Sequence, residues 1–193
     1  MRLYDVAGNR LYLTVEERDR FLSWAAKASP PIRTLCETLA FTGCRISEAL
    51  ELTPGRVRLD EQQIVLRSLK KRREDIYRAV PVPADYLDRL NMVHRIRESQ
   101  RRRKHVEVPL WSWSRQHAST FIIKAVMADA GIIAGPHRTA KGLRHAFGVN
   151  AITRNVPLNM LQKWLGHADI KTTAIYANAI GAEEHAIAAR MWE

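Results

Sequence analysis

The chain has 193 residues, with 31 Lys and Arg against 20 Asp and Glu, and a formal net charge of +11. Its hydrophobic content of 46% and charged content of 26% are ordinary for a globular protein. No apolar run approaches the roughly 20 residues needed to span a membrane, and the first residues lack the apolar region of a secretion signal. The isoelectric point of about 10.2 favours a nucleic-acid partner, although acidic proteins and anionic membranes also attract basic proteins.

The first part of the chain reads as helices followed by a small sheet. Thr14 and Glu17 form a capping box that predicts a helix start, and Thr42-Gly43 breaks the second helix. Three short, alternating, β-branched stretches then predict an antiparallel sheet with turns at 60–63 and 69–75. The expected elements are an arm over 1–13, helices over 14–28, 32–41 and 46–52, and strands over 57–59, 64–67 and 76–82.

The rest of the chain reads as helices only. Ser114, Pro136, Pro157 and Asp169 are the expected helix starts, and the last of these helices carries Tyr176. The expected helices cover 84–97, 114–130, 136–154 and 157–165, then a segment from 169, and a last segment over 179–192. The fold class is therefore α+β, mostly α-helical, with one small three-stranded antiparallel sheet. We expect an arm (1–13), a main domain (14–178) and a C-terminal helical tail (179–193).

The two cysteines, Cys36 and Cys44, lie eight residues apart on one helix and its exit. Two helical turns separate them by roughly 12 Å, which is too far for a disulfide. We expect both to be reduced, as in a cytoplasmic protein.

Two basic segments in the first half of the chain are candidate phosphate ligands. Arg45 lies at a junction between two helices, where its planar guanidinium can face an anion; taken alone, a surface salt bridge explains it better. The run Lys70, Lys71, Arg72 and Arg73 lies at a hairpin turn. These side chains can reach DNA or form an ordinary solvated loop, and the sequence favours neither.

Two further segments lie in the second half. Lys141 and Arg144 are three residues apart and share one helical face, where two cations repel unless an anion lies between them. His167 follows Gly166 in a short connection, and Tyr176 lies nine residues later. A single helical Tyr is more often an ordinary core or surface aromatic than a nucleophile.

In combination these segments resemble the catalytic domain of the tyrosine recombinase (phage integrase) family. The family's Thr-Gly-x-Arg-x-Ser-Glu-x-x-x-Leu segment matches 42–52, with Arg45 as its Arg. A family Lys on a β-hairpin matches Lys70, with Lys71 a close rival. The His-x-Leu-Arg-His segment matches 141–145 and supplies Arg144, and a Leu-Gly-His segment supplies His167. Tyr176 takes the nucleophile's place, and the resemblance extends from residue 14 to about residue 180.

The resemblance implies site-specific DNA strand exchange through a 3′-phosphotyrosine, in integration, excision or inversion, with no metal or cofactor. Tyr176 would attack the phosphorus while Arg45, Arg144 and His167 donate to the non-bridging oxygens. Lys70 would protonate the departing 5′-oxygen. Lys141 would stand near the phosphate; because the family usually has His there, the proton acceptor for Tyr176 stays open.

Double-stranded DNA is the implied partner, bound by a homotetramer on two DNA sites in the cytoplasm, at the nucleoid of a bacterial or phage-bearing cell. The apolar stripe of the tail suits docking on a neighbouring subunit or packing on its own domain. Two other functions remain: a catalytically silent DNA-binding protein with this fold, and a type IB topoisomerase-like enzyme. Candidate DNA contacts are Lys71, Arg72, Arg73, His137, Arg138 and Lys171.

Overall fold

The computed structural model describes residues 2–68, 76–178, 182–189, 191 and 192. The first elements in chain order are α1 (Val15–Ala25), α2 (Pro30–Thr42), α3 (Ile46–Leu50), the 3₁₀ turn η1 (Pro54–Arg56), β1 (Val57–Arg58), β2 (Gln63–Arg67), β3 (Tyr77–Pro81), α4 (Ala84–His94) and α5 (Ile96–Gln100). They are followed by α6 (Arg115–His117), the π-helical η2 (Ala118–Ile123), α7 (Lys124–Asp129), α8 (Ala140–Thr153), α9 (Leu158–Leu165), α10 (Lys171–Ala174), the 3₁₀ turn η3 (Ile175–Asn178) and α11 (Ala182–Ala189).

The predicted fold class is confirmed: helices dominate, and one antiparallel sheet has the strand order β1-β2-β3. Ile64 pairs with Val57 on one side and Val80 on the other. All three side chains are buried, because alternate residues of a strand point to the same face. The sheet therefore packs one apolar face against the helices.

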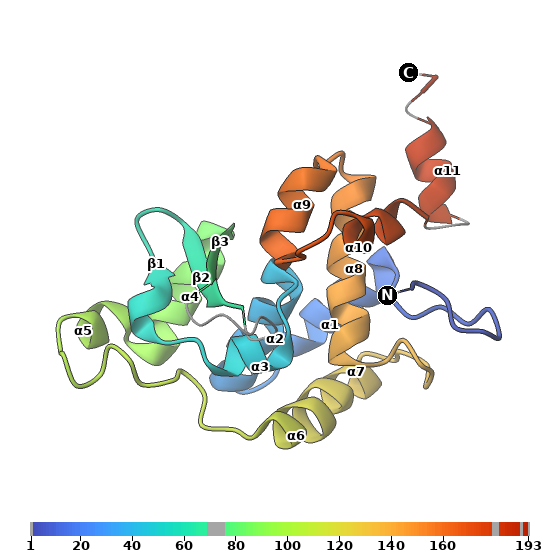
Figure 1. Ribbon diagram of the computed structural model, residues 1–193. Coiled ribbons are helices and arrows are strands. Elements are labelled where there is room, and N and C mark those ends of the chain that lie inside the picture. The colour runs from blue at the N-terminus through green and yellow to red at the C-terminus, as the bar shows by residue number, and fades with distance from the viewer. Residues whose placement is uncertain (1, 69–75, 179–181, 190, 193) are drawn as a thin grey trace.

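Helix α8 is the central element of the molecule (Figure 1). It contacts α1 and α2 on one side and α9, η3 and α11 on another. The main core lies between the sheet, α1, α2, α4, α7 and the first turns of α8. A second, smaller core lies farther along α8 and contains Leu3, Tyr12, Val149, Leu161, Leu165 and Tyr176 among others. The expected arm thus contributes two side chains, Leu3 and Tyr12, to the core that holds Tyr176.

Several helix ends differ from the predicted ones for local reasons. Pro30 and Pro31 occupy the first turn of α2 instead of preceding it, where a missing N–H costs nothing. The single helix expected over 84–97 is broken at Arg95, which has a left-handed φ of 50°. Tyr176 lies in the 3₁₀ turn η3 that follows the short helix α10.

The start of α8 is four residues later than predicted. Thr139, not Pro136, caps the helix, and its side chain accepts a hydrogen bond from Gly142 N at 2.9 Å. The preceding loop folds back over the first turn, since a Cβ on Gly142 would lie 1.8 Å from the carbonyl oxygen of His137. That fold-back prevents the helix from extending to Pro136.

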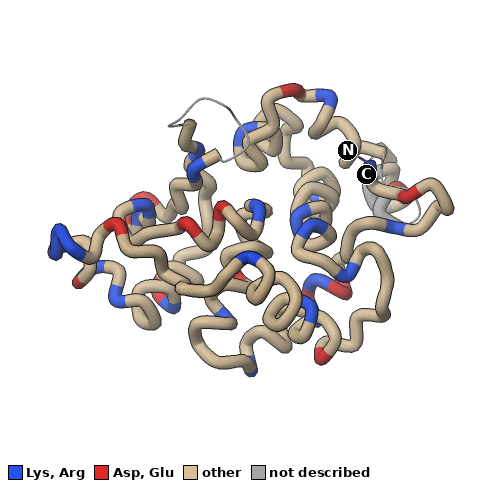
Figure 2. Tube along the Cα trace, turned by 60° about the horizontal axis from the view of Figure 1, so that its bottom comes forward, with Lys and Arg blue, Asp and Glu red and all other residues tan. Residues whose placement is uncertain are grey.

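Basic and acidic residues are interspersed over the described part of the chain rather than separated into two regions (Figure 2). Cys36 and Cys44 are buried and free, as predicted. Across the described ranges, no helix combines the length and hydrophobicity required to cross a bilayer.

Candidate active site

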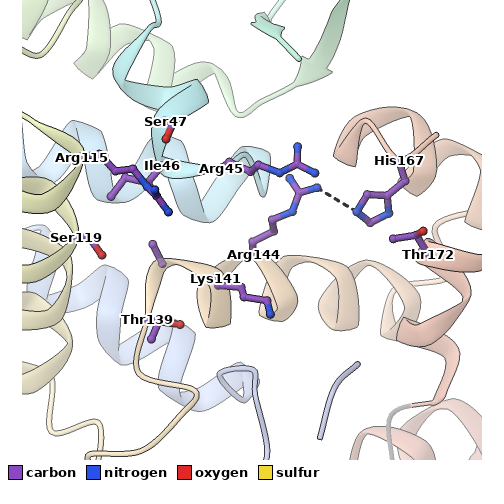
Figure 3. A pocket seen from close by; sticks show the side chains of 11 residues that line it. Arg45, Ile46, Ser47, Arg115, Ser119, Thr139, Lys141, Arg144, His167 and Thr172 are labelled. Carbon is purple, nitrogen blue, oxygen red and sulfur yellow. Dashed lines mark hydrogen bonds between the residues drawn. The ribbon is translucent and has the colours of Figure 1, made fainter. Parts of the chain in front are cut away.

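A cleft of about 660 Å³ opens between α3, α6 and α8 and the loop before α10 (Figure 3). Two of its side chains, Arg45 from the start of α3 and Arg144 from α8, extend into the same part of the cleft. Its lining consists of Arg45, Ile46, Ser47, Arg115, Ser119, Thr139, Ala140, Lys141, Arg144, His167 and Thr172. The structure therefore brings four of the predicted catalytic residues, Arg45, Lys141, Arg144 and His167, to one cavity.

Arg144 is fixed by the carboxyl ends of two helices. Its Nη1 donates to the carbonyl oxygen of Gly43, which caps α2, at 2.7 Å, and its Nη2 donates to that of Leu165, the last residue of α9, at 2.8 Å. Carbonyl groups at a helix C-terminus lack intrahelical donors and carry partial negative charge. Among the described residues no carboxylate pairs with this guanidinium, so its positive charge is not neutralised by an ion pair there.

Glycines make both of these helix ends possible. Gly43 and Gly166 have φ values of 60° and 67°, the left-handed conformation that ends a helix. Space is also restricted: a Cβ on Gly43 would lie 2.4 Å from the Phe147 ring, and one on Gly166 would lie 3.0 Å from the Arg78 side chain. Each glycine is required for its backbone conformation and for the closeness of its neighbour.

His167 is oriented by Arg144 on one side and Thr173 on the other. Its Nε2 lies 3.0 Å from Arg144 Nη2, and its Nδ1 lies 2.9 Å from Thr173 Oγ1. Because a guanidinium only donates, Nε2 accepts, and the ring proton resides on Nδ1 and is donated to Thr173. In the free protein His167 therefore acts as a support for Arg144.

Arg45 is held by a buried carboxylate. Glu48 accepts from the Arg45 backbone N at 2.9 Å and from Arg45 Nη1 at 2.7 Å. Arg78, on β3, binds the same carboxylate through Nη2 at 2.6 Å and donates from Nε to the carbonyl oxygen of Trp164 at 2.7 Å. Arg78 therefore connects the sheet to both the Arg45 junction and the end of α9.

Burial and crowding of cations set the protonation states. Burial, followed by repulsion from Arg45, lowers the pKa of Arg144 to about 10. Burial and the charge of Arg144 lower the pKa of His167 to about 3. Burial alone would raise the pKa of Glu48, but Arg78 and Arg45 outweigh it and the pKa is lowered. At neutral pH the cleft thus holds charged arginines and a neutral His167, which favours an anionic ligand.

Tyr176 lies beside this cleft but does not line it. Its side chain is fully buried, and its hydroxyl lies 3.2 Å from Nδ1 of His145. Its ring is nearly parallel to that of His167, with a centroid distance of 6.4 Å and an interplanar angle of 9°. Burial raises the pKa of Tyr176 to about 12, although Arg144 and Arg45 act in the opposite direction.

The remaining predicted residues are placed differently. Lys141 is exposed on the cleft side of α8. His137 lies 3.6 Å from Glu17, Arg138 donates to the carbonyl oxygen of Ile132 at 3.3 Å, and Lys171 is exposed at the start of α10; none of these three lines the cleft. The predictions for Lys70, Lys71, Arg72 and Arg73 concern residues outside the described ranges.

Four ionisable residues in or beside the site were not predicted from the sequence: Glu48, Arg78, Arg115 and His145. Glu48 had a visible signal, since it follows Arg45 by three residues at a helix start. His145 follows Arg144 directly. Because adjacent helical residues point about 100° apart, the two side chains face different parts of the molecule. Arg78 and Arg115 are brought to the site only by the tertiary fold.

In the part of the chain that the structure describes, no three His, Cys, Asp or Glu side chains gather to hold a metal ion.

Comparison with known proteins places this site in a family. The family model described as "Phage integrase family" matches residues 11–182. The chain is 30% identical over 173 residues to tyrosine recombinase XerA of Thermococcus kodakarensis, covering 85% of this chain and 56% of the relative. It is 32% identical over 162 residues to tyrosine recombinase XerD of Brucella abortus, covering 80% and 50%. The chain therefore spans about half the length of these relatives.

Solved structures agree on the fold. The XerH site-specific recombinase, in a post-cleavage complex with a palindromic difH substrate, matches with a TM-score of 0.76 and 25% identity over 97% of this chain and 55% of that one. The catalytic domain of bacteriophage HP1 integrase matches with a TM-score of 0.65 and 22% identity, over 92% and 93%. Because the family model matches most of its length, residues 11–182, this chain belongs to the phage integrase family.

Proposed function

We propose that this chain is the strand-cleaving and strand-joining part of a site-specific DNA recombinase. The observation that carries the proposal is the pair Arg45 and Arg144 in one cleft, with His167 hydrogen-bonded to Arg144. Two guanidinium groups that share a cavity without a neutralising carboxylate on Arg144 are suited to a phosphodiester. The XerH structure is bound to a palindromic difH substrate and the Tn1549 transposon integrase is in complex with circular intermediate DNA, which supports DNA as the partner here.

The proposed reaction conserves the energy of the phosphodiester bond. The Tyr176 hydroxyl releases its proton to the surrounding water and its oxygen forms a bond to phosphorus. The bond from phosphorus to the 5′-oxygen breaks, and a 3′-phosphotyrosine and a 5′-hydroxyl result. Arg45 and Arg144 stabilise the charge that grows on the non-bridging oxygens. Lys70 supplies the proton for the departing oxygen, and Lys141, exposed at the cleft, neutralises the phosphate. A 5′-hydroxyl from another strand reverses the step.

The proposal extends to the assembly and the DNA contacts. Two DNA sites are joined by a homotetramer in the cytoplasm. The C-terminal tail (179–193) docks on a neighbouring subunit or packs on its own domain, where α11 contacts α8. Lys71, Arg72 and Arg73 read or hold DNA from the hairpin, and His137, Arg138 and Lys171 add backbone contacts. Cross-linking of the protein with and without DNA tests the stoichiometry.

A nicked duplex carrying the cognate site tests the chemistry, because loss of the short 5′-hydroxyl strand traps the covalent intermediate. The unmodified chain is expected to form a protein–DNA adduct that denaturing electrophoresis resolves, and Tyr176→Phe to form none. Tyr77→Phe is the matched control, since Tyr77 is exposed on β3 and should leave the adduct unchanged. No adduct with the unmodified chain, or an adduct with Tyr176→Phe, would reject the proposal; supercoil relaxation without site preference would indicate a topoisomerase-like enzyme instead.

A further inference from the structure

The position of Tyr176 presents a physical problem for the proposed reaction. A nucleophile must approach the phosphorus, and the phosphate is expected between Arg45 and Arg144. Tyr176 is fully buried, in the second core, and does not line the cleft that contains both arginines. For its hydroxyl to meet a phosphate there, the tyrosine or the side chains that cover it have to move.

The hydroxyl of Tyr176 has a specific partner on α8. Nδ1 of His145 lies 3.2 Å from it, and His145 is itself fully buried. Among the described residues, His145 Nε2 is buried with no hydrogen-bond partner. Within those residues, the His145 ring therefore makes its side-chain hydrogen bond to Tyr176. Because helical residues turn by about 100° each, Arg144 faces the cleft while His145 faces the second core.

The ring of Tyr176 fits a notch in the same face of α8. Gly148 lies three residues after His145 and thus on the same side of the helix. A Cβ at Gly148 would lie 2.5 Å from two carbons of the Tyr176 ring, a distance at which the ring has to move. Helix α8 therefore offers a hydrogen-bond partner for the hydroxyl and a space for the ring, one turn apart.

We propose that His145 and Gly148 form a holding site that keeps Tyr176 withdrawn from the cleft, with His145 as a positioning residue for the tyrosine hydroxyl. The holding site itself is independent of the reaction. That Tyr176 leaves it for a phosphate between Arg45 and Arg144 rests on the proposed function.

Nitration of the free protein with tetranitromethane, followed by peptide mass spectrometry, tests the holding site without DNA. Two other tyrosines serve as internal controls. Tyr77 is 45% exposed and should react in every variant, whereas Tyr86 is fully buried in the main core and hydrogen-bonded to Thr38, so its protection reports that the fold is intact. In the unmodified chain Tyr176 should be protected like Tyr86.

Three variants separate the hydrogen bond from the notch. His145→Leu removes the partner at similar volume, and Tyr176 nitration should rise about two- to tenfold, as for the loss of one buried hydrogen bond. His145→Asn keeps a polar group near the place of Nδ1 and should restore much of the protection. Gly148→Ala pushes the ring out from the other side and should raise nitration by about tenfold or more.

The results are read in variants where Tyr86 stays protected. The proposal is overturned if Tyr176 reacts like Tyr77 in the unmodified chain, or if His145→Leu and Gly148→Ala both leave it protected. It is also overturned if His145→Asn releases Tyr176 as fully as His145→Leu, because the side chain would then act by packing alone. Failure of adduct formation would reject the recombinase proposal and leave these nitration results unaffected, so the two failures are distinguishable.

Discussion

Arg78 and Glu48 show, at the scale of single residues, how the site depends on a contact that joins distant parts of the chain. The carboxylate of Glu48 is fully buried and receives Arg78 Nη2 at 2.6 Å. Arg78 also bonds Ser68 and the carbonyl oxygen of Trp164. A single buried guanidinium thus fixes the carboxylate that orients Arg45, and the same group fixes the end of α9 beside His167.

Removal of Arg78 is expected to destabilise the protein strongly. Arg78→Met leaves Glu48 buried with only Arg45 as its charged partner, and breaking a buried pair in this way costs about 3–5 kcal/mol. Urea denaturation measures the free energy of unfolding. The matched control is Arg58→Met on β1 of the same sheet, because Arg58 bonds Glu61 at 3.1 Å with both side chains more than half exposed, and an exposed pair contributes about 1 kcal/mol or less. Equal costs for the two variants would show that the Arg78 pair does not support the fold.

The sequence predicted four of the residues that line this cleft, but not the contacts that hold them. Short local patterns contain Arg45, Arg144 and His167, so these residues can be recognised from the sequence without a structure. The bond between Arg78 and Glu48 spans 30 residues, and no local pattern encodes it. The same holds for Tyr176, whose burial against His145 depends on how η3 packs on α8.

At the scale of elements, the site is built from helix ends rather than helix faces. The carboxyl ends of α2 and α9 converge on Arg144, and the start of α3 carries Arg45. Thr14 and Glu17 gave the start of α1 correctly because a capping box is local. The start of α8 was misplaced because Pro136 and Thr139 are both valid start signals, and only the fold-back of the loop selects Thr139.

Gly43→Ala tests the importance of the α2 end. The new Cβ would contact Phe147 at 2.4 Å at a φ of 60°, so strain and overpacking together should cost about 2–4 kcal/mol. Gly8→Ala is the control, since Gly8 has a φ of 80° with no atom within 4 Å and should show the strain of about 1–2 kcal/mol alone. Thermal or urea unfolding measures both. Adduct formation by Gly43→Ala should also slow, because the Gly43 carbonyl that holds Arg144 is displaced; a variant as stable and active as Gly8→Ala would refute this account.

At the scale of the whole molecule, three histidines with strongly lowered pKa values lie in or beside the two cores: His145 and His167 are buried, and His94 is half-buried. Burial is the first cause that lowers their pKa, to about 4 for His94 in the main core, about 4 for His145 and about 3 for His167. His94 lies against Thr34 and Trp111, whereas His145 and His167 adjoin Tyr176. Each is neutral in the folded protein at neutral pH. Because they lie in or beside two different cores, their protonation is expected to lower the stability of the whole fold rather than of one region.

Stability is therefore expected to fall as the pH is lowered from 7.5 to 5. The unfolded chain binds protons at these residues below a pKa of 6.5, but the folded chain does not until the pH approaches 4. The contribution of each His is thus fully present above pH 6.5 and is progressively lost below it, by up to about 2 kcal/mol per residue at pH 5. The buried carboxylates with lowered pKa, Glu17 and Glu48, act below their usual value of 4.5 and so stay outside this window.

The difference in the free energy of unfolding between pH 7.5 and pH 5, from urea titrations, measures the effect. His94→Asn and His145→Asn should each reduce this difference, whatever their own cost in stability at pH 7.5, because each removes one proton-binding group from the unfolded chain. His105→Asn is the control: His105 is exposed, and its replacement should leave the difference at the value of the unmodified chain. A pH dependence that survives both replacements unchanged would locate the acid sensitivity elsewhere. If the pH dependence falls in His145→Asn but not in His94→Asn, the acid sensitivity is confined to the core around Tyr176. Acid unfolding would then be coupled to the release of this tyrosine.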